Sequence, residues 1–418
     1  MNTSSLALLG GQPVIPGRDR QFSWPPITAD TASAVAAQLA RSVSIYDRSG
    51  VVEDLEDSLC SYHGSAHSVL TSSGTAALHS MYAACDLGPG DEVIVPAYTF
   101  FATVTPLLHL GATPVLADCD ETGSLDPMDA SRRITSRTKA IVVTHMWGLP
   151  ADMTRLADLA DRHGLMLLED ASHAHGAAIN GRKVGTFGRA AAFSMNGPKP
   201  LSAGEGGFVL TDDDETYYRV LLHGQYNKRC RNEIPTTHPL YPFAVTGMGL
   251  KLRIHPLAAA IALDQLARLD TYLDARTTMA EVMCQELGKL PGIVAPTLAQ
   301  GVRASWYGLP LIYQSEELDG LPVQRLHEAI LAEGCHEADR PGSTCPLNLL
   351  PLFQNPQPLL PAFSGGLSYE PGDFPVAEAL WRNTIKLPVW HREEDRALID
   401  QYIDAIGKVI ANYRDLLG

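Results

Sequence analysis

The sequence predicts an α/β protein with a mainly parallel sheet covered by helices, because short apolar runs alternate with amphipathic ones from about residue 65. The apolar runs have the near-continuous hydrophobic character of strands that are buried on both faces. We expect these strands at residues 68–71, 92–95, 114–117, 140–143 and 165–168. The clearest helix covers residues 152–164, which begin with aspartate, repeat apolar residues at helical spacing and end in glycine.

A change in the pattern near residue 270 predicts a second, smaller α/β domain. A long helical stretch ends in Pro291 and Gly292, and a proline-rich region and a final helix over residues 393–417 follow it. A chain of 418 residues suits two domains. We therefore expect a large domain at residues 1–270, including an N-terminal segment at 1–30, and a small domain at 271–418.

Composition and charge exclude several classes of protein. A net charge of −15 argues against nucleic-acid binding, which requires clustered Lys and Arg. The one basic cluster, residues 227–231, predicts a solvated loop or a contact with a substrate or neighbouring subunit. Seven scattered cysteines without a C-x-x-C pair are typical of a reducing compartment. No apolar run approaches the length of a membrane span, so we expect a cytoplasmic protein.

Candidate site residues follow the predicted strands, because ligands of such sheets bind beyond the carboxyl ends of the strands. After the first strand, Ser73, Gly74 and Thr75 begin a helix. The N–H groups and peptide dipoles at a helix start favour a bound phosphate, although an ordinary serine or threonine cap is the alternative. After the second strand, an aromatic ring within residues 98–101 could stack on a planar ligand or belong to the core.

Asp170 ends a strongly apolar strand, where an unpaired charge is costly, so this carboxylate needs a cationic partner. A protonated ring nitrogen would serve, and so would a metal ion with His173 and His175 as further ligands. The spacing matches no zinc signature, and we expect no metal. A carboxylate with a purely structural role is the remaining alternative.

A lysine lies in an unusual setting after the next strand end. Ser194 precedes Lys199 by five residues, a span of no more than about 17 Å when fully extended. Prolines flank the lysine, and the Gly-Glu-Gly-Gly run at 204–207 lets the backbone pass close by. One small ligand could therefore meet both the hydroxyl and the amine, whose direction the prolines and glycines fix.

A phosphate cradle, a stacking ring, a buried carboxylate and a positioned lysine together meet the requirements of pyridoxal phosphate. The lysine forms a Schiff base with the aldehyde of this cofactor. The carboxylate keeps the pyridinium nitrogen protonated, so that the ring can accept electrons. We therefore expect pyridoxal 5′-phosphate as the cofactor, with Lys199 and Asp170 as its chemical partners.

Over nearly its whole length the sequence resembles the DegT/DnrJ/EryC1/StrS aminotransferases, which are fold type I pyridoxal phosphate enzymes. The motifs that carry this resemblance lie at residues 73–78, 96–100, 145–148, 169–176 and 194–207. The spacing of the last motif, and the start at residues 6–14, are most similar to the branch that aminates keto-cyclitols in aminoglycoside pathways. The resemblance implies a mainly parallel seven-stranded sheet between helices, a smaller C-terminal α/β domain and a homodimer.

The resemblance also implies roles for individual residues. Lys199 would be the Schiff-base lysine and proton shuttle, Asp170 would pair with the pyridine nitrogen, and His173 would approach the ring hydroxyl. The residues that would hold the phosphate or cover the ring are Ser73, Gly74, Thr75, Ser194 and Phe100.

Three positions depart from the pattern of the family. Lys251 stands where an asparagine commonly reaches the phosphate of the neighbouring subunit, and a lysine could still serve a phosphate as a point charge. Asn348 replaces a usual histidine and Tyr307 a frequent one, both near the substrate side. The identity of the substrate is therefore the part of the function that the resemblance specifies least.

The implied reaction is a ping-pong transfer in which L-glutamine or L-glutamate gives its amine to the cofactor, which then aminates a ketone on a polyhydroxylated ring. One alternative is the amination of a nucleotide-linked keto-sugar. A second is a pyridoxamine-dependent dehydratase, but in that branch histidine replaces the lysine found here at Lys199. A third is a non-catalytic regulatory protein, against which the intact pair of Lys199 and Asp170 argues.

Overall fold

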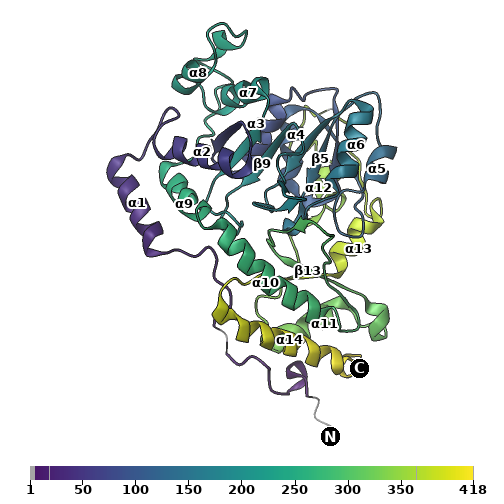
Figure 1. Cartoon of the computed structure of the whole chain (residues 1–418). Helices are drawn as coiled ribbons and strands as arrows, with labels where there is room; N and C mark the ends of the chain where they lie inside the picture. Colours follow the sequence, from purple (N-terminus) through teal and green to yellow (C-terminus); the bar gives the residue numbers. More distant parts are fainter. Residues whose placement is uncertain (1–4, 18, 364, 418) are drawn as a thin grey trace.

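The computed structural model describes residues 5–17, 19–363 and 365–417. The predicted domains at 1–270 and 271–418 also include residues 1–4, 18, 364 and 418, which lie outside the described residues. The centre of the molecule is a seven-stranded sheet (Figure 1). Its strands, in spatial order, are β1 (His67–Thr71), β10 (Gly207–Thr211), β9 (Ala190–Ser194), β6 (Met166–Asp170), β5 (Thr138–Thr144), β2 (Glu92–Pro96) and β4 (Thr113–Ala117).

The sheet is mainly parallel, as the sequence predicts. Strands β9, β6, β5, β2 and β4 run parallel, and only β10 pairs antiparallel with its two neighbours, β1 and β9. All five strands expected from the sequence are present, with ends that differ by at most two residues from the expected ones. The α/β fold with a mainly parallel sheet is therefore confirmed.

Helices cover both faces of this sheet, because alternate residues of each strand enter different apolar clusters. Val93 and Val142 pack on one face, whereas Ile94 and Val143 pack on the other. Helices on the first face are α3 (Gly74–Ala84), α4 (Thr105–Leu110) and α7 (Asp214–Gly224). Helices on the second face are α2 (Val51–His63), α5 (Pro127–Arg132), α6 (Met153–His163) and α9 (Pro256–Leu266).

Helix α6 shows why the sequence pattern predicted it correctly. The side chain of Asp152 accepts a hydrogen bond from the N–H of Arg155 and so caps the first turn. The apolar residues of the pattern are the buried ones, and Gly164 ends the helix with a φ of 63°, in the left-handed region that glycine favours.

The C-terminal part forms a second apolar cluster around a small antiparallel sheet of β11 (Ile293–Val294), β13 (Leu309–Tyr313) and β15 (Thr384–Leu387). Helix α10 (Leu269–Leu287) connects the two sheets (Figure 1). The other elements of this part are α11 (Val323–Ala332), β14 (Thr344–Pro346), α12 (Pro351–Gln354), α13 (Pro375–Asn383) and α14 (Arg396–Ala411). Short strands β7 (Ala178–Ile179), β8 (Arg182–Lys183) and β12 (Val302–Arg303) form a third sheet.

Two sets of contacts cross the predicted domain boundary. Leu6 and Ile15, from the N-terminal segment expected in the large domain, are buried in the C-terminal cluster. Strand β14 pairs with β3 (Tyr98–Phe100), and Leu347 and Phe353 pack in the cluster of the large sheet. The division at residue 270 therefore stays a prediction.

The seven cysteines are all free thiols. Among the described residues, no helix has both the length and the apolar character needed to cross a membrane.

The solvated loop expected at residues 227–231 is wrong for Arg229. This residue lies in α8 (Lys228–Glu233), is 2% exposed, and donates two hydrogen bonds of 2.8 Å to the carboxylate of Glu56. Glu56 is fully buried and also accepts from the N–H of Leu70. A buried carboxylate needs a cation, and Arg229 is its buried partner, with Arg48 donating a further hydrogen bond of 3.1 Å. Lys228 and Arg231, in contrast, stay exposed.

Removing the guanidinium of Arg229 should destabilise the protein strongly. In Arg229→Met the carboxylate of Glu56 stays buried without its main partner, which costs about 3–5 kcal/mol. Urea denaturation followed by circular dichroism measures the change. Arg231→Met, at an exposed position of the same helix, is the matched control and should change stability by less than about 0.5 kcal/mol. Equal effects of the two substitutions would contradict the structural role of Arg229.

Candidate active site

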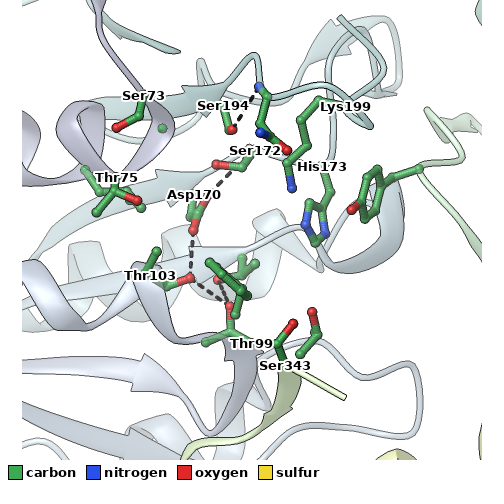
Figure 2. A pocket seen from close by; sticks show the side chains of 18 of the residues that line it. Ser73, Thr75, Thr99, Thr103, Asp170, Ser172, His173, Ser194, Lys199 and Ser343 are labelled. Atoms are coloured by element: carbon green, nitrogen blue, oxygen red, sulfur yellow. Dashed lines mark hydrogen bonds between the residues drawn. The ribbon is translucent and has the colours of Figure 1, made fainter. Parts of the chain in front are cut away.

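A cavity of about 340 Å³ lies where the parallel strands β5, β6 and β9 end (Figure 2). All but one of the residues that the sequence singles out for the site line this cavity. They are Ser73, Gly74, Thr75, Phe100, Asp170, His173, Ser194 and Lys199. The exception is Lys251, which is exposed and does not line the cavity of its own chain.

One corner of the cavity is formed by the start of α3 and the end of β9. Ser73 caps the helix by accepting a hydrogen bond from the N–H of Ala76 at 3.1 Å. A side chain at Gly74 would not fit, because its Cβ would lie 2.4 Å from the Cβ of Ser194. The helix start and the serine hydroxyl are therefore in direct contact, and such a corner suits an anion.

Asp170 and its neighbour Glu169 point to opposite faces of β6, as successive strand residues do. The Asp170 carboxylate lies in the cavity, where it accepts from the hydroxyl of Thr103 at 2.7 Å and from the N–H of Ser172 at 3.1 Å (Figure 2). Glu169 is fully buried on the other side and accepts from the N–H groups of residues 185, 187 and 188. Glu169 therefore has a structural role, whereas the assignment of Asp170 to a bound ligand stays a prediction.

A chain of buried threonines supports Asp170. The Oγ1 atoms of Thr99 and Thr103 lie 2.8 Å apart, and Thr99 contacts Thr144 at 3.2 Å. All three line the cavity, and the sequence interpretation missed them. Thr103 lies three residues after Phe100, which was the only signal that could have drawn attention to it.

The amine of Lys199 reaches the same cavity from the loop after β9 (Figure 2). Burial lowers the pKa of Lys199 to about 8, an effect that the negative charge of Asp170 opposes and the positive charge of Lys386 reinforces. The Nζ atom lies 4.5 Å from the centre of the Tyr307 ring. A sizeable fraction of this amine is therefore neutral near physiological pH, which is the form that acts as a nucleophile or base.

Three rings stack beside the amine. The ring of His173 lies 4.1 Å from that of Tyr307 and 6.0 Å from that of Trp147, with interplanar angles of 20° and 26°. Burial, together with the charge of Lys199, holds the pKa of His173 well below its usual value, so its imidazole is neutral. Its Nδ1 atom is buried and has no hydrogen-bond partner among the described residues.

The C-terminal part closes the cavity. Ser343 and Thr344 enter its lining because β14 pairs with β3, with Thr344 opposite Phe100. Tyr307, one of the residues where the family pattern breaks, also lines the cavity. Asn348 does not: it is fully buried and donates hydrogen bonds to Glu378 and to the carbonyl of residue 370.

The alternative of a metal site finds no support in the geometry. His173 lines the cavity, whereas His175 packs against Phe193, with ring centres 5.2 Å apart. Within the part of the chain that the structure describes, no group of three His, Cys, Asp or Glu side chains is arranged to hold a metal ion.

Comparison with known proteins finds aminotransferases, both as a family and as individual relatives. Residues 27–404 match the DegT/DnrJ/EryC1/StrS aminotransferase family. The chain is 36% identical over 360 residues to the L-glutamine:scyllo-inosose aminotransferase of Streptomyces griseus, with 82% of this chain and 83% of that protein covered. It is 33% identical over 397 residues to the dTDP-3-amino-3,4,6-trideoxy-alpha-D-glucose transaminase of Streptomyces venezuelae, with 94% and 96% covered.

Among solved structures, the aminotransferase from Psychrobacter cryohalolentis is similar over almost the whole chain. The TM-score is 0.82 at 28% identity, and the match covers 94% of this chain and 99% of that one. The sheet and the arrangement of the C-terminal part are thus those of known aminotransferases.

The amine of Lys199 should titrate near pH 8 in the cofactor-free protein. Because a lowered pKa favours the neutral form, acetylation of Lys199 should rise with pH through about 8 and then level off. Asp170→Asn removes a charge that raises this pKa and should move the midpoint down. Lys386→Met removes a charge that lowers it and should move the midpoint up.

Mass spectrometry of the Lys199 peptide after brief treatment with acetic anhydride measures these three midpoints. A midpoint at or above pH of about 10, the value of a solvated lysine, would show that the amine does not lie in the cavity.

Proposed function

We propose that this chain, which belongs to the DegT/DnrJ/EryC1/StrS aminotransferase family, moves an amino group from L-glutamine or L-glutamate to a keto-cyclitol, in the biosynthesis of an aminoglycoside or a related natural product. Membership of this family makes the chain a transaminase that depends on pyridoxal phosphate. Relatives named for L-glutamine and inosose substrates support the donor and the acceptor. The observation that carries the proposal is the amine of Lys199 in one cavity with the carboxylate of Asp170.

The described side chains fit this cofactor. The corner where Gly74 meets Ser194, at the start of α3, suits its phosphate, with Ser73 and Thr75 as hydroxyl donors. Asp170 has lone pairs left for a protonated ring nitrogen, and the unpartnered Nδ1 of His173 can meet the ring hydroxyl. Phe100 lines the cavity and offers a ring face.

Lys199 is the residue that we propose to move protons. When bound, pyridoxal phosphate supplies an aldehyde carbon that amines can join and a ring that takes up electrons. With a pKa of about 8, the Nζ of Lys199 can be neutral, take a proton from carbon and return it. One side chain can therefore serve the donor half and the acceptor half of the transfer.

The lining of the cavity favours an uncharged polyhydroxylated acceptor. Lys199 is the one Lys or Arg among the described residues that line it, and the other polar groups are mainly hydroxyls, together with one amide, one imidazole and two carboxylates. Ser343, Thr344 and Asn196 can exchange hydrogen bonds with ring hydroxyls. A nucleoside diphosphate carries two or more negative charges and would need cations besides Lys199, which the described residues of the lining do not supply.

A homodimer is part of the proposal. Lys251 is exposed in a segment that also exposes the apolar side chains of Phe243, Val245 and Met248. An apolar surface of this kind suits burial against a second copy. Lys251 would then lie near the phosphate corner of the neighbouring cavity.

L-Glutamine should convert the cofactor from its aldehyde form to its amine form in the loaded protein. The absorbance spectrum reports this half-reaction without any acceptor. Lys199→Ala should abolish it, with a loss in rate of at least about a thousandfold, because none of the other described residues that line the cavity carries an amine. Lys139→Ala, at an exposed lysine outside the cavity lining, is the matched control for general damage. Retained transfer in Lys199→Ala would end the assignment of this lysine.

The acceptor should be a cyclitol ketone rather than a nucleotide-linked sugar ketone. After L-glutamine has loaded the amine form, each ketone is added separately, and the return of the aldehyde spectrum gives its rate. We expect a keto-inositol to react at least tenfold faster than a nucleoside-diphosphate keto-sugar, because the cavity offers hydroxyls and few cations. The reverse order would assign the chain to nucleotide-sugar chemistry, as in its dTDP-sugar relative. If neither L-glutamine nor L-glutamate produces the half-reaction, the chain is not a catalyst of this kind.

A further inference from the structure

An extended N-terminal strap, residues 19–28, connects the C-terminal part of the molecule to the loop that carries Lys199. The strap contains no helix or strand before α1 (Ala29–Arg41). At its start, the indole N–H of Trp390 donates to the carbonyl of Gln21 at 2.8 Å. Further along, the indole N–H of Trp24 donates to the backbone carbonyl of Lys199, also at 2.8 Å.

The ring of Trp24 lies against a buried guanidinium. Arg276, on α10, is 1% exposed, and its Cζ lies 3.8 Å from the centre of the Trp24 ring. Its Nε atom has no hydrogen-bond partner, and no carboxylate pairs with it in the part of the chain that the structure describes. Burial without a counter-charge lowers the pKa of Arg276 to about 9. Burying an unpaired cation costs free energy, so this placement calls for a compensating role.

The same guanidinium also holds the far side of the cavity. An N–H of Arg276 donates to the backbone carbonyl of Trp306 at 3.0 Å. Trp306 has a φ of 52°, a left-handed conformation that is unfavourable for a tryptophan and needs support from its surroundings. The next residue, Tyr307, stacks on His173 and faces the Nζ of Lys199 at 4.5 Å.

Arg276 therefore contacts two tryptophans. Trp24 lies on the side of the Lys199 backbone, and Trp306 lies on the side of the Lys199 amine. Through Trp24 it reaches the backbone carbonyl of the lysine, and through Trp306 it reaches the ring beside the amine. We propose that Arg276 and Trp24 are positioning residues for the reaction, which hold Lys199 at both ends so that its amine stays at a fixed place in the cavity. This inference rests on the proposed role of Lys199 in the transfer.

Substitutions of two tryptophans that donate equivalent hydrogen bonds distinguish a positioning role from a purely stabilising one. Trp24→Phe keeps a ring under Arg276 but removes the N–H that holds the carbonyl of Lys199. Trp390→Phe removes an equivalent N–H, with the same 2.8 Å hydrogen bond, at the other end of the strap. Both variants should melt at a lower temperature, but only Trp24→Phe should affect Lys199.

Two measurements report the effect of Trp24→Phe on Lys199. In the loaded protein, Trp24→Phe should slow the half-reaction at saturating L-glutamine by about tenfold, because small displacements of a reacting group are costly, while the apparent Kd for L-glutamine stays within about twofold. In the cofactor-free protein, the pH midpoint for acetylation of Lys199 should rise, since a loosened amine meets more water. Trp390→Phe should leave rate and midpoint unchanged.

Substitutions at Arg276 give an independent check. Arg276→Met should change the rate and the midpoint in the same directions as Trp24→Phe. Arg276→Lys keeps a cation over Trp24 and should lie between Arg276→Met and the unmodified protein, even if Arg276→Met fails to fold. Unchanged rate and midpoint in Trp24→Phe, with a loss of stability equal to that of Trp390→Phe, would overturn the inference. If the unmodified protein shows no half-reaction, the proposed function fails, whereas the acetylation midpoints still decide the positioning.

Discussion

The amine of Lys199 and the carboxylate of Asp170 share one cavity, and the chemistry available to this protein depends on the balance between them. Burial favours the neutral form of Lys199, and the charge of Asp170 favours the protonated form. The net result is a pKa of about 8 for Lys199, below that of a solvated lysine. A lysine on the surface would stay protonated, and burial without the carboxylate would lower the pKa of Lys199 further. The end of β6 and the loop after β9 hold these two groups in the same cavity.

The parallel sheet provides much of that support. Strand ends β5, β6 and β9 meet at one edge, so residues far apart in the sequence arrive at one place without long loops. At the end of β6 the alternation of strand residues assigns Glu169 to the folding of the turn at residues 185–188 and Asp170 to the cavity. Two adjacent carboxylates thus have separate tasks, and substitution of one need not disturb the other.

The sequence allowed the sheet and most of the cavity lining to be predicted, because those residues obey local rules. Asp170, Ser194 and Lys199 each follow a buried strand, and parallel strands share an edge. Ser343 gives no local signal, since it enters the cavity only through the pairing of β14 with β3. The local signal at Arg276 is misleading, because an arginine within an amphipathic helix is expected at the surface. Arg276 is instead buried against Trp24 and Trp306, which come from distant segments.

The path of the N-terminal strap has a consequence for how the protein is made. Ile15 donates its N–H to the carbonyl of Glu333, and the carbonyl of Gln21 accepts from the indole N–H of Trp390, so residues 15–21 find their partners far later in the sequence. The large sheet, whose strands lie between residues 67 and 211, can form during translation. Residues 15–21 therefore reach these contacts only after residues 333 and 390 have been synthesised. A chain that stops before residue 333 would contain the strands of the large sheet but would lack Ser343 and Thr344 of the cavity lining.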